Sequence, residues 1–431
     1  MPHDSEKRRH EILDRMRRRR RDFHRYPETG WAEFRTTAVI ADALEPLGWT
    51  LRLADEYICP DDVMGRAADP EEEKARAVRQ GANPAAVAKL GEYTGLCAEL
   101  DTGADGPVTA LRFDIDCVDV TEASDDEHLP AREGFASVNP GRMHSCGHDG
   151  HAAIGIALAE MLSIEETRAA LGGKIRLLFQ PAEEGVRGGY AMSRAGVADD
   201  ADNFIALHLG LGRPTGDVCG GIGGFLCTEK IDAVFRGISA HSGGEPHKGR
   251  NALLGAATAA LNLHAIAPHS DGTTRINVGV MQAGDGRNVI AQNALLKIET
   301  RGETDDLKTY VSDRTAEVLE GAARMYGLSL SVTLQGAANT AESTPELAAL
   351  VAEIARTTPG VNKISERGHM PGSDDAAWLM KRVQDNGGRA VYIGVGADTS
   401  AGHHNDRFDF DETAMDIALE VLYRTVRRLH G

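Results

Sequence analysis

Hydrophobic positions in the first half of the chain follow helical and strand-like spacing in turn. From about residue 6 to residue 47 apolar residues recur at helical intervals, interrupted by Tyr-Pro-Glu-Thr-Gly at residues 26–30, so we expect a helix, a turn and a second helix. Further on, the pattern predicts a helix at residues 150–164 and buried strands at residues 108–114, 173–180 and 204–208. Such alternation of strands and helices is typical of α/β domains.

Two later segments depart from this rhythm. Residues 61–91 are charged and rich in alanine, without a run of β-branched residues, which predicts a helical insertion. Beyond Cys219 the spacing predicts an amphipathic helix at residues 251–266 and antiparallel strands at residues 230–236, 275–281 and 295–301. After about residue 335 the earlier rhythm returns, with a strand at residues 391–395 and a final helix at residues 413–429.

The pattern as a whole predicts two units in one chain. At 431 residues the chain exceeds the roughly 250 to 300 residues that one hydrophobic core usually serves. We expect an α/β protein whose larger domain, a mixed sheet with flanking helices, is built from residues 1–225 and 337–431. A smaller α+β domain at residues 226–336 is inserted between them, and the glycines at residues 220–224 suit a hinge.

Composition narrows the range of partners and compartments. The formal net charge of −18 argues against nucleic acid or an anionic membrane as a partner. The arginine run at residues 17–21 stands near Glu11 and Asp14, which indicates a solvated helix face rather than a nucleic-acid arm. The six cysteines form no C-x-x-C pair, and neither an apolar leader nor an apolar run of membrane-spanning length occurs, so we expect a cytoplasmic protein.

One segment, residues 143–151, is dense in side chains that bind metals: Met-His-Ser-Cys-Gly-His-Asp-Gly-His. Within it Cys146 and His148 offer a thiolate and an imidazole, both good ligands for borderline divalent metals. Asp149 and His151 are suited to orient those ligands. A buried cysteine beside a surface histidine is the alternative, but the density of the cluster favours a metal site.

Carboxylates and further histidines occur where predicted strands end. Glu183 and Glu184 point in different directions, so that one can bind a metal while the other moves protons. His208 ends the next strand, and either His403 or His404 could bind metal, with His404 favoured. An exposed acidic turn and a satisfied core histidine are the alternatives. Six residues make sense together as a binuclear metal site, which makes the chain a metallohydrolase candidate: Cys146, His148, Glu183, Glu184, His208 and His404.

Several blocks of the sequence resemble the metal-dependent aminoacylase, hippurate hydrolase and carboxypeptidase superfamily. They are residues 143–151, 179–185, 208, 237–251 and 403–410, within a match that runs from about Arg21 to the C-terminus. The resemblance implies that Cys146 bridges two metal ions and that Glu183 is the general base. The ligands that it implies beside Cys146 are His148, Glu184, His208 and His404.

The resemblance also implies roles for residues around the metals. Asp114 or Asp116 would orient the ligands. His241, in the smaller domain, would reach a partner chain's active site and stabilise the tetrahedral oxyanion, so the smaller domain would be a lid and dimerisation domain. The substrate's carboxylate would be held by Asn288 and Arg301, helped by the backbone near Gly372 and Ser373.

The implied activity is hydrolysis of a linear amide bond with two divalent ions, Mn²⁺ first and Zn²⁺ as the alternative. Residues 23–31, the insertion near 60–90 and residues 402–405 most resemble the branch of the superfamily that cleaves p-aminobenzoyl-glutamate, a folate breakdown product. The implied partners are a small anionic N-acyl amino acid as substrate and either a second copy of the chain or a paralogous subunit. Other N-acyl or N-aroyl amino acids or dipeptides are alternative substrates, and an inactive binding or regulatory subunit is the other alternative. Ala291 and Asp406 stand where relatives often carry proline. These differences affect the loops near the substrate's carboxylate and do not change any predicted metal ligand.

Overall fold

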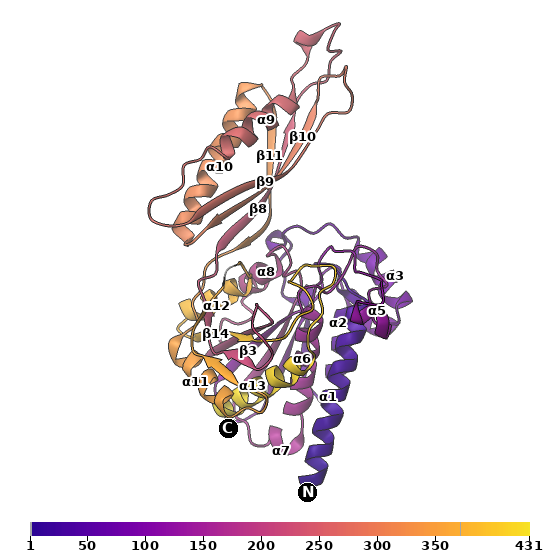
Figure 1. Ribbon diagram of the computed structural model, residues 1–431, viewed down its shortest axis with the longest axis vertical. Coiled ribbons are helices and arrows are strands. Elements are labelled where there is room, and N and C mark those ends of the chain that lie inside the picture. The colour runs from indigo at the N-terminus through magenta and orange to yellow at the C-terminus, as the bar shows by residue number, and fades with distance from the viewer. Residues whose placement is uncertain (1, 371) are drawn as a thin grey trace.

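The computed structural model describes residues 2–370 and 372–431, and its larger part is built on an eight-stranded mixed sheet (Figure 1). The order across this sheet is β1 (Thr50–Leu53), β2 (Leu96–Asp101), β4 (Lys174–Gln180), β3 (Val108–Asp114), β5 (Asn203–Leu209), β14 (Arg389–Val395), β6 (Asp217–Cys219) and β12 (Lys363–Ser365). The four central strands β4, β3, β5 and β14 run parallel, while β1 and β2 add antiparallel neighbours at one edge.

Helices cover both faces of this sheet, which is why its central strands are apolar along most of their length. One face packs on α1 (Pro2–Arg25), α2 (Phe34–Leu44), α6 (His148–Leu162), α11 (Pro345–Arg356) and α13 (Thr413–His430). The other face packs on α8 (Gly188–Arg194) and α12 (Ala376–Asp385). Successive residues of β5 belong to different cores, Phe204 to the second and Ile205 to the first, as expected of a strand covered on both sides.

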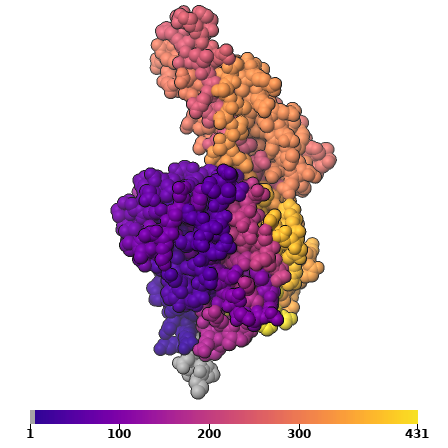
Figure 2. Space-filling view, turned by 180° about the vertical axis from the view of Figure 1, so that it is seen from behind, coloured from indigo at the N-terminus to yellow at the C-terminus, as the bar shows by residue number. Residues whose placement is uncertain are grey.

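A second sheet of four antiparallel strands projects from this body (Figures 1 and 2). Its order is β11 (Ser329–Ala338), β8 (Cys227–Arg236), β10 (Asn293–Gly302) and β9 (Thr274–Ala283). Helices α9 (Ala252–Leu263) and α10 (Asp305–Met325) cover one face with a separate apolar core, and the other face is polar. The predicted fold class, α/β with an additional α+β unit, is therefore confirmed.

The segment predicted as one helical insertion contains two short helices, each with its own cap. They are α3 (Pro70–Arg79), capped by Asp69, and α4 (Pro84–Lys89), capped by Asn83. The remaining α-helices and strands are short: α5 (Leu129–Glu133), α7 (Glu165–Arg168), β7 (Ile222–Gly223) and β13 (Gly368–His369). Among the described helices, none is both long and apolar enough to cross a lipid bilayer.

The arginine-rich side of α1 is partly buried. Arg20 is fully buried, and its guanidinium lies 2.9 Å from Asp149, 2.5 Å from Asp409 and 3.4 Å from Glu412. The expectation of a solvated face is therefore wrong at Arg20, because α1 packs along α6 and against the loop before α13. Buried carboxylates, rather than water, surround this charge.

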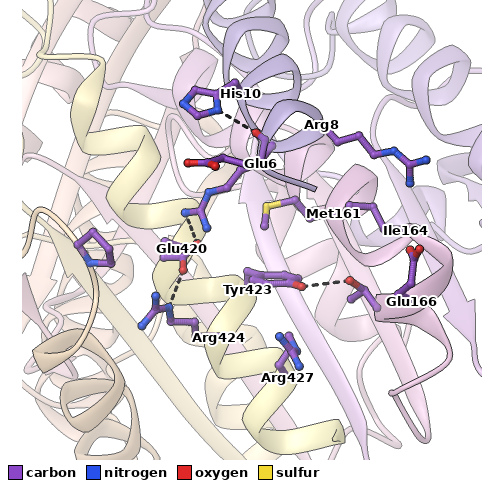
Figure 3. Close-up of a pocket in the computed structure, with 13 residues that line it drawn as sticks. Glu6, Arg8, His10, Met161, Ile164, Glu166, Glu420, Tyr423, Arg424 and Arg427 are labelled. Atoms are coloured by element: carbon purple, nitrogen blue, oxygen red, sulfur yellow. Dashed lines mark hydrogen bonds and ion pairs between the residues drawn. The ribbon is translucent and has the colours of Figure 1, made fainter. Parts of the chain in front are cut away.

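A cavity of about 1130 Å³ lies near the start of α1, between α1, the end of α6 and α13 (Figure 3). In it Arg9 and Arg424 both donate to the buried carboxylate of Glu420, each at 2.5 Å. The hydroxyl of Tyr423 lies 3.1 Å from that of Thr167. The Arg9–Glu420 contact connects α1 with α13, and the Tyr423–Thr167 contact joins α13 to the Glu165–Arg168 helix. No predicted site residue lines the cavity.

Candidate metal centre

The predicted metal ligands lie at the carboxyl ends of the central strands of the eight-stranded sheet, on strand and helix ends and on the loops between them. β3, β4 and β5 are parallel, so their carboxyl ends lie together, and these ends carry Asp114, the segment before Glu183, and His208. α6 begins at His148 beside them. Ligands of open α/β sheets bind at this edge because the connecting loops converge there.

Cys146 belongs to two groups of side chains that are each close enough to hold one metal ion. One group is Cys146, His148 and His208, and the other is Cys146, Glu184 and His404; within each, the ligand atoms lie within 4.8 Å of one another. Cys146 Sγ is 3.6 Å from His208 Nε2, and His404 Nε2 is 3.3 Å from Glu184 Oε1. The structure thus brings all five predicted ligands together, with the thiol common to both groups.

Two of the imidazoles are oriented as metal ligands. The Nδ1–H of His148 donates to the backbone oxygen of Asp116 at 2.9 Å, and that of His208 donates to the backbone oxygen of Leu209 at 2.7 Å. This leaves Nε2 of each ring as the free electron-pair donor. Nε2 of His148 is buried without a hydrogen-bond partner in the described structure, which fits a bound cation.

His151 lies next to this cluster but is already fully hydrogen-bonded. Its Nδ1 faces Asp114 Oδ1 at 2.5 Å, and its Nε2 accepts a hydrogen bond from the backbone N–H of Leu209 at 3.1 Å. Its ring packs on His148 with a centroid distance of 5.4 Å. His151 therefore keeps no free nitrogen for a metal, and its role in orienting the neighbouring His148 stays a prediction.

The adjacent carboxylates Glu183 and Glu184 are fixed by one buried aspartate. The two backbone N–H groups donate to the two oxygens of Asp116, at 3.0 and 2.9 Å. The flanking residues Ala182 (φ 52°) and Val186 (φ 59°) have left-handed backbone, which is strained for residues with a side chain. Glu184 turns toward His404, while Glu183 lies near Asp374 and Asp375.

The electrostatics of the cluster favour cations. Burial, followed by the carboxylates of Asp374 and Glu184, raises the pKa of Glu183 well above its usual range. Burial, followed by Glu184, also raises the pKa of the Cys146 thiol. Bound divalent cations would reverse both effects, because they stabilise thiolate and carboxylate. The donor set of one thiol, three imidazoles and carboxylates therefore fits the metals that the sequence predicts.

Arg112, which stands behind the cluster in β3, was not among the residues predicted for the site. This buried guanidinium donates to Asp114 at 2.5 Å, to Gln180 at 2.8 Å and to Asp375 at 3.1 Å. It connects the aspartate that orients His151 with an acid that neighbours Glu183. An arginine inside an otherwise apolar strand was the available signal.

His403 and His404 occupy different positions. Nδ1 of His403 lies 3.7 Å from Cys146 Sγ, but its Nε2 accepts a hydrogen bond from the backbone N–H of Leu211 at 3.3 Å. Burial, followed by His404, lowers the pKa of His403 to about 4. His404 has left-handed backbone (φ 63°) and reaches Glu184. This geometry favours His404, whose role as a ligand stays a prediction.

The other predicted site residues lie on or next to the small sheet. The ring of exposed His241 accepts hydrogen bonds from Gly243 and Gly244 N–H, and Ser242 N–H donates to the backbone oxygen of Asn288 at 3.1 Å. Arg301 binds Glu299 through two bonds of 3.0 Å. Gly372 and Ser373 both bond to the backbone of Leu226, which precedes β8. Among the described residues, neither His241, Asn288 nor Arg301 makes a hydrogen bond or ion pair with the five predicted ligands.

This fold and site identify the class of the protein. The chain belongs to the peptidase family M20/M25/M40, whose family model matches residues 110–428. The resemblance seen in the sequence is thereby confirmed, and the chain is a metal-dependent hydrolase of amide bonds.

The relatives place it more closely. It is 50% identical over 419 residues to the indole-3-acetyl-aspartic acid hydrolase of Enterobacter agglomerans, covering 96% of each chain. It is 49% identical over 413 residues to one subunit of the p-aminobenzoyl-glutamate hydrolase of Escherichia coli strain K12, covering 94% of each chain.

Two solved structures have the same fold. An aminobenzoyl-glutamate utilization protein from Klebsiella pneumoniae superimposes with a TM-score of 0.83 at 41% identity, over 98% of both chains. A dinuclear metal-binding peptidase of the M20 family from Bacillus subtilis superimposes with a TM-score of 0.65 at 23% identity, over 97% of this chain and 98% of that one.

Proposed function

We propose that this protein hydrolyses p-aminobenzoyl-glutamate to p-aminobenzoate and glutamate, using two divalent metal ions, Mn²⁺ first and Zn²⁺ as the alternative. The observation that carries the proposal is that two groups of possible metal ligands share Cys146. A buried carboxylate, Glu183, lies beside them and belongs to neither group. The likeness to the Escherichia coli hydrolase supplies the substrate.

The proposed chemistry divides the work among the residues of the cluster. Cys146, His148, Glu184, His208 and His404 hold the cations, which polarise the amide carbonyl and make water more acidic. Glu183 accepts a proton from the attacking water and passes it to the amide nitrogen. The hydroxyl joins the acyl carbon, the carbon–nitrogen bond breaks, and the amine leaves with that proton. Asp116 holds Glu183 in place throughout, because its carboxylate accepts hydrogen bonds from the backbone N–H groups of Glu183 and Glu184.

A second candidate substrate is indole-3-acetyl-aspartate, which the relative in Enterobacter agglomerans is named for. Both candidates join an aromatic acyl group to an acidic amino acid through an amide bond. They belong to the wider class of N-acyl and N-aroyl amino acids that the sequence analysis kept open, together with dipeptides. An inactive binding or regulatory subunit is disfavoured, because Glu183 and the complete ligand set are retained.

The small sheet with its two helices is proposed as a lid and dimerisation domain of residues 226–336, between catalytic parts 1–225 and 337–431. In this proposal Asn288 and Arg301, with the backbone at Gly372 and Ser373, bind the substrate's α-carboxylate, and His241 serves the partner chain's site. The partner is a second copy of the chain or a paralogous subunit. The Escherichia coli relative supports this, because it is named as one subunit of its hydrolase. We also propose a cytoplasmic location, supported by six cysteines that are all free.

The test is an assay of the purified chain after chelation and after addition of Mn²⁺ or Zn²⁺. Release of p-aminobenzoate is measured from p-aminobenzoyl-glutamate, and release of indole-3-acetate from indole-3-acetyl-aspartate in parallel. Metal-dependent release of p-aminobenzoate at the higher kcat/KM supports the proposal. A higher kcat/KM for the indole substrate would make the second candidate the function, and no release of either product from metal-loaded protein would contradict both.

A further inference from the structure

Arg187 follows Glu184 by three residues, and its charge has no counter-ion among the described residues. Its Nε and Nη2 donate to the backbone oxygen of Glu184 at 3.0 and 2.8 Å, and its Nη1 donates to that of Gly65 at 2.8 Å. No carboxylate in the described parts of the chain lies within 4.0 Å of its nitrogens. A half-buried guanidinium held by neutral oxygens alone keeps its attraction for an anion.

Two glycines make room for this side chain. Gly65 and Gly185 have left-handed backbone, with φ of 61° and 92°. A Cβ atom at Gly65 would lie 2.8 Å from Arg187 Cδ, and one at Gly185 would lie 2.7 Å from Arg187 Nε. Both sites therefore require glycine for two reasons, conformation and space. The loops on either side of Arg187 are shaped to hold it in one position.

Lys230 of β8 approaches Arg187 from the small sheet. Lys230 stands opposite Gly336 of β11, and a Cβ atom at Gly336 would lie 1.9 Å from the backbone oxygen of Gly185. The next residue of β11, Ala337, donates its N–H to the oxygen of Val186 at 2.8 Å. The end of β11 is thus fastened to the Arg187 loop, which brings the neighbouring strand and Lys230 close to it.

The ammonium group of Lys230 is only partly neutralised. Its one carboxylate neighbour within the described residues is Glu299, at 3.5 Å. Glu299 is already bound by both Nε and Nη2 of Arg301. Glu299 is therefore shared by Lys230 and Arg301, on the face of the small sheet that α9 and α10 do not cover. The positive charge of Lys230 is left partly free to attract a second carboxylate.

Arg187 and Lys230 line the same pocket, a cavity of about 560 Å³ between the small sheet and the loop after Glu184. Asp119 and Asp232 line it too, but neither forms an ion pair within 4.0 Å in the described structure. The volume is in the range of pockets that bind small organic molecules. Arg187, Lys230 and Lys297 thus offer three cationic groups to a small organic anion, beside the carboxylates of Asp119, Asp232 and Glu299.

We propose that Arg187 and Lys230 bind the side-chain carboxylate of an acidic amino acid in the substrate, and so determine specificity for that amino acid. The inference rests on the proposed function, in which Asn288 and Arg301 are assigned to the α-carboxylate and a second carboxylate is left without a partner. The two relatives are named for a glutamate and an aspartate conjugate, and these two amino acids differ by one methylene group. The fixed Arg187 and the flexible stem of Lys230 together accommodate both lengths.

The experiment compares p-aminobenzoyl-glutamate with p-aminobenzoyl-glutamine, which has nearly the same shape and the same α-carboxylate but an uncharged side chain. Both release p-aminobenzoate, so one assay of the metal-loaded enzyme gives kcat/KM for each. We expect the wild type to prefer the glutamate substrate by roughly ten- to a hundredfold, as a charged hydrogen bond allows. In Lys230→Gln and Arg187→Gln, kcat/KM for the glutamate substrate should fall while kcat/KM for the glutamine substrate stays unchanged, so that most of the preference is lost. Arg187→Lys should keep part of the preference.

Arg236→Gln is the matched control. Arg236 is exposed and lies on the same strand and the same open face as Lys230, but outside the pocket, so this variant should keep the wild-type ratio. An equal loss on both substrates in Lys230→Gln and Arg187→Gln would show a structural role and overturn the inference. So would a wild type that does not distinguish the two substrates.

The inference and the proposed function can fail separately. If the wild type cleaves neither p-aminobenzoyl substrate, the same comparison is made with indole-3-acetyl-aspartate and indole-3-acetyl-asparagine. A preference for the aspartate substrate that is lost in Lys230→Gln supports the inference although the first candidate function has failed. The absence of such a preference, or of any turnover, overturns it.

Discussion

Glu183 is the single residue on which the proposed chemistry most depends. It is buried, lies close to His148 and Glu184, and belongs to neither group that shares Cys146. Replacing it with glutamine keeps the size of the side chain but removes the proton acceptor. We expect Glu183→Gln to lower kcat by about a hundred- to ten-thousandfold, with two metal ions still bound. Turnover and metal content are measured on the same preparation.

Glu184→Gln is the control for that variant. It makes the same substitution one position along the chain, but removes a predicted ligand that lies near His404. We expect this variant to lose metal affinity, and its activity to recover in part when the metal concentration is raised. Unchanged turnover in Glu183→Gln, or loss of metal from it, would contradict the assignment of the general base.

At the scale of residues, the metal cluster could be predicted and the groups behind it could not. Predicted ligands such as His208 stand where apolar strands end, and the carboxyl ends of parallel strands meet, so their convergence follows from the pattern. Arg112 stands inside β3, where the spacing does not show which side chains it meets. Its partner Asp375 is 263 residues away in the sequence. Contacts at such separation depend on the folded arrangement and leave no local signal.

At the scale of elements, the contact of α1 with the start of α6 should make stability depend on pH through His24. Its ring nitrogens lie 2.9 Å from Asp149 and 2.9 Å from Glu122. Burial lowers the pKa of His24, but the hydrogen bonds to these carboxylates outweigh it and raise the pKa from 6.5 to about 9. Because the folded pKa is the higher, this stabilisation is complete below pH 6.5 and is lost as pH rises through about 9.

We expect this loss to be on the order of 3 kcal/mol in the free energy of unfolding. Urea denaturation of wild type and His24→Gln across that pH range measures it, and the variant should show a much smaller change between the two ends. His10→Gln alters an exposed histidine of the same helix and should behave as the wild type. Equal pH dependence in wild type and His24→Gln would show that His24 is not the titrating group.

Helices and strands could be predicted from the sequence where their side chains are well buried. Elements that are short or half exposed were harder to predict. The strands β3, β4 and β5 have apolar runs and lie close to their predicted positions. The edge strand β1 is four residues long and half exposed, so its hydrophobic pattern is weak. Within residues 61–91, a turn at Gly81 (φ 90°) separates two helices where composition suggested one.

At the scale of the whole molecule, the small sheet presents apolar side chains to solvent. Leu261 on α9 is 77% exposed, and Leu254 on the same helix and Met281 on the edge strand β9 are 44% and 46% exposed. Exposed apolar groups on a helix and on the edge strand beside it favour association with another chain. This supports the proposed dimer, in which His241 acts on the partner's substrate.

Mixing two inactive variants tests that arrangement. Glu183→Gln removes the proposed base and keeps His241, whereas His241→Ala keeps the base and removes the imidazole. Exchange of chains between them forms dimers in which one site combines an intact Glu183 with an intact His241 from the other chain. With free exchange we expect about a quarter of the wild-type activity, since half of the dimers are mixed and each has one complete site.

The result depends on whether His241 acts within its own chain or across the dimer. If it acts within its own chain, each chain of a mixed dimer carries one defect and no activity returns. Fluorescence energy transfer between one variant labelled with a donor dye and the other labelled with an acceptor dye shows whether chains have exchanged, because only mixed dimers carry both dyes. Recovery that grows with the mixed fraction therefore places His241 in the partner's site. Exchange of chains without recovery of activity would place His241 in the active site of its own chain. The proposed lid domain would then have to close over the catalytic domain of the same chain.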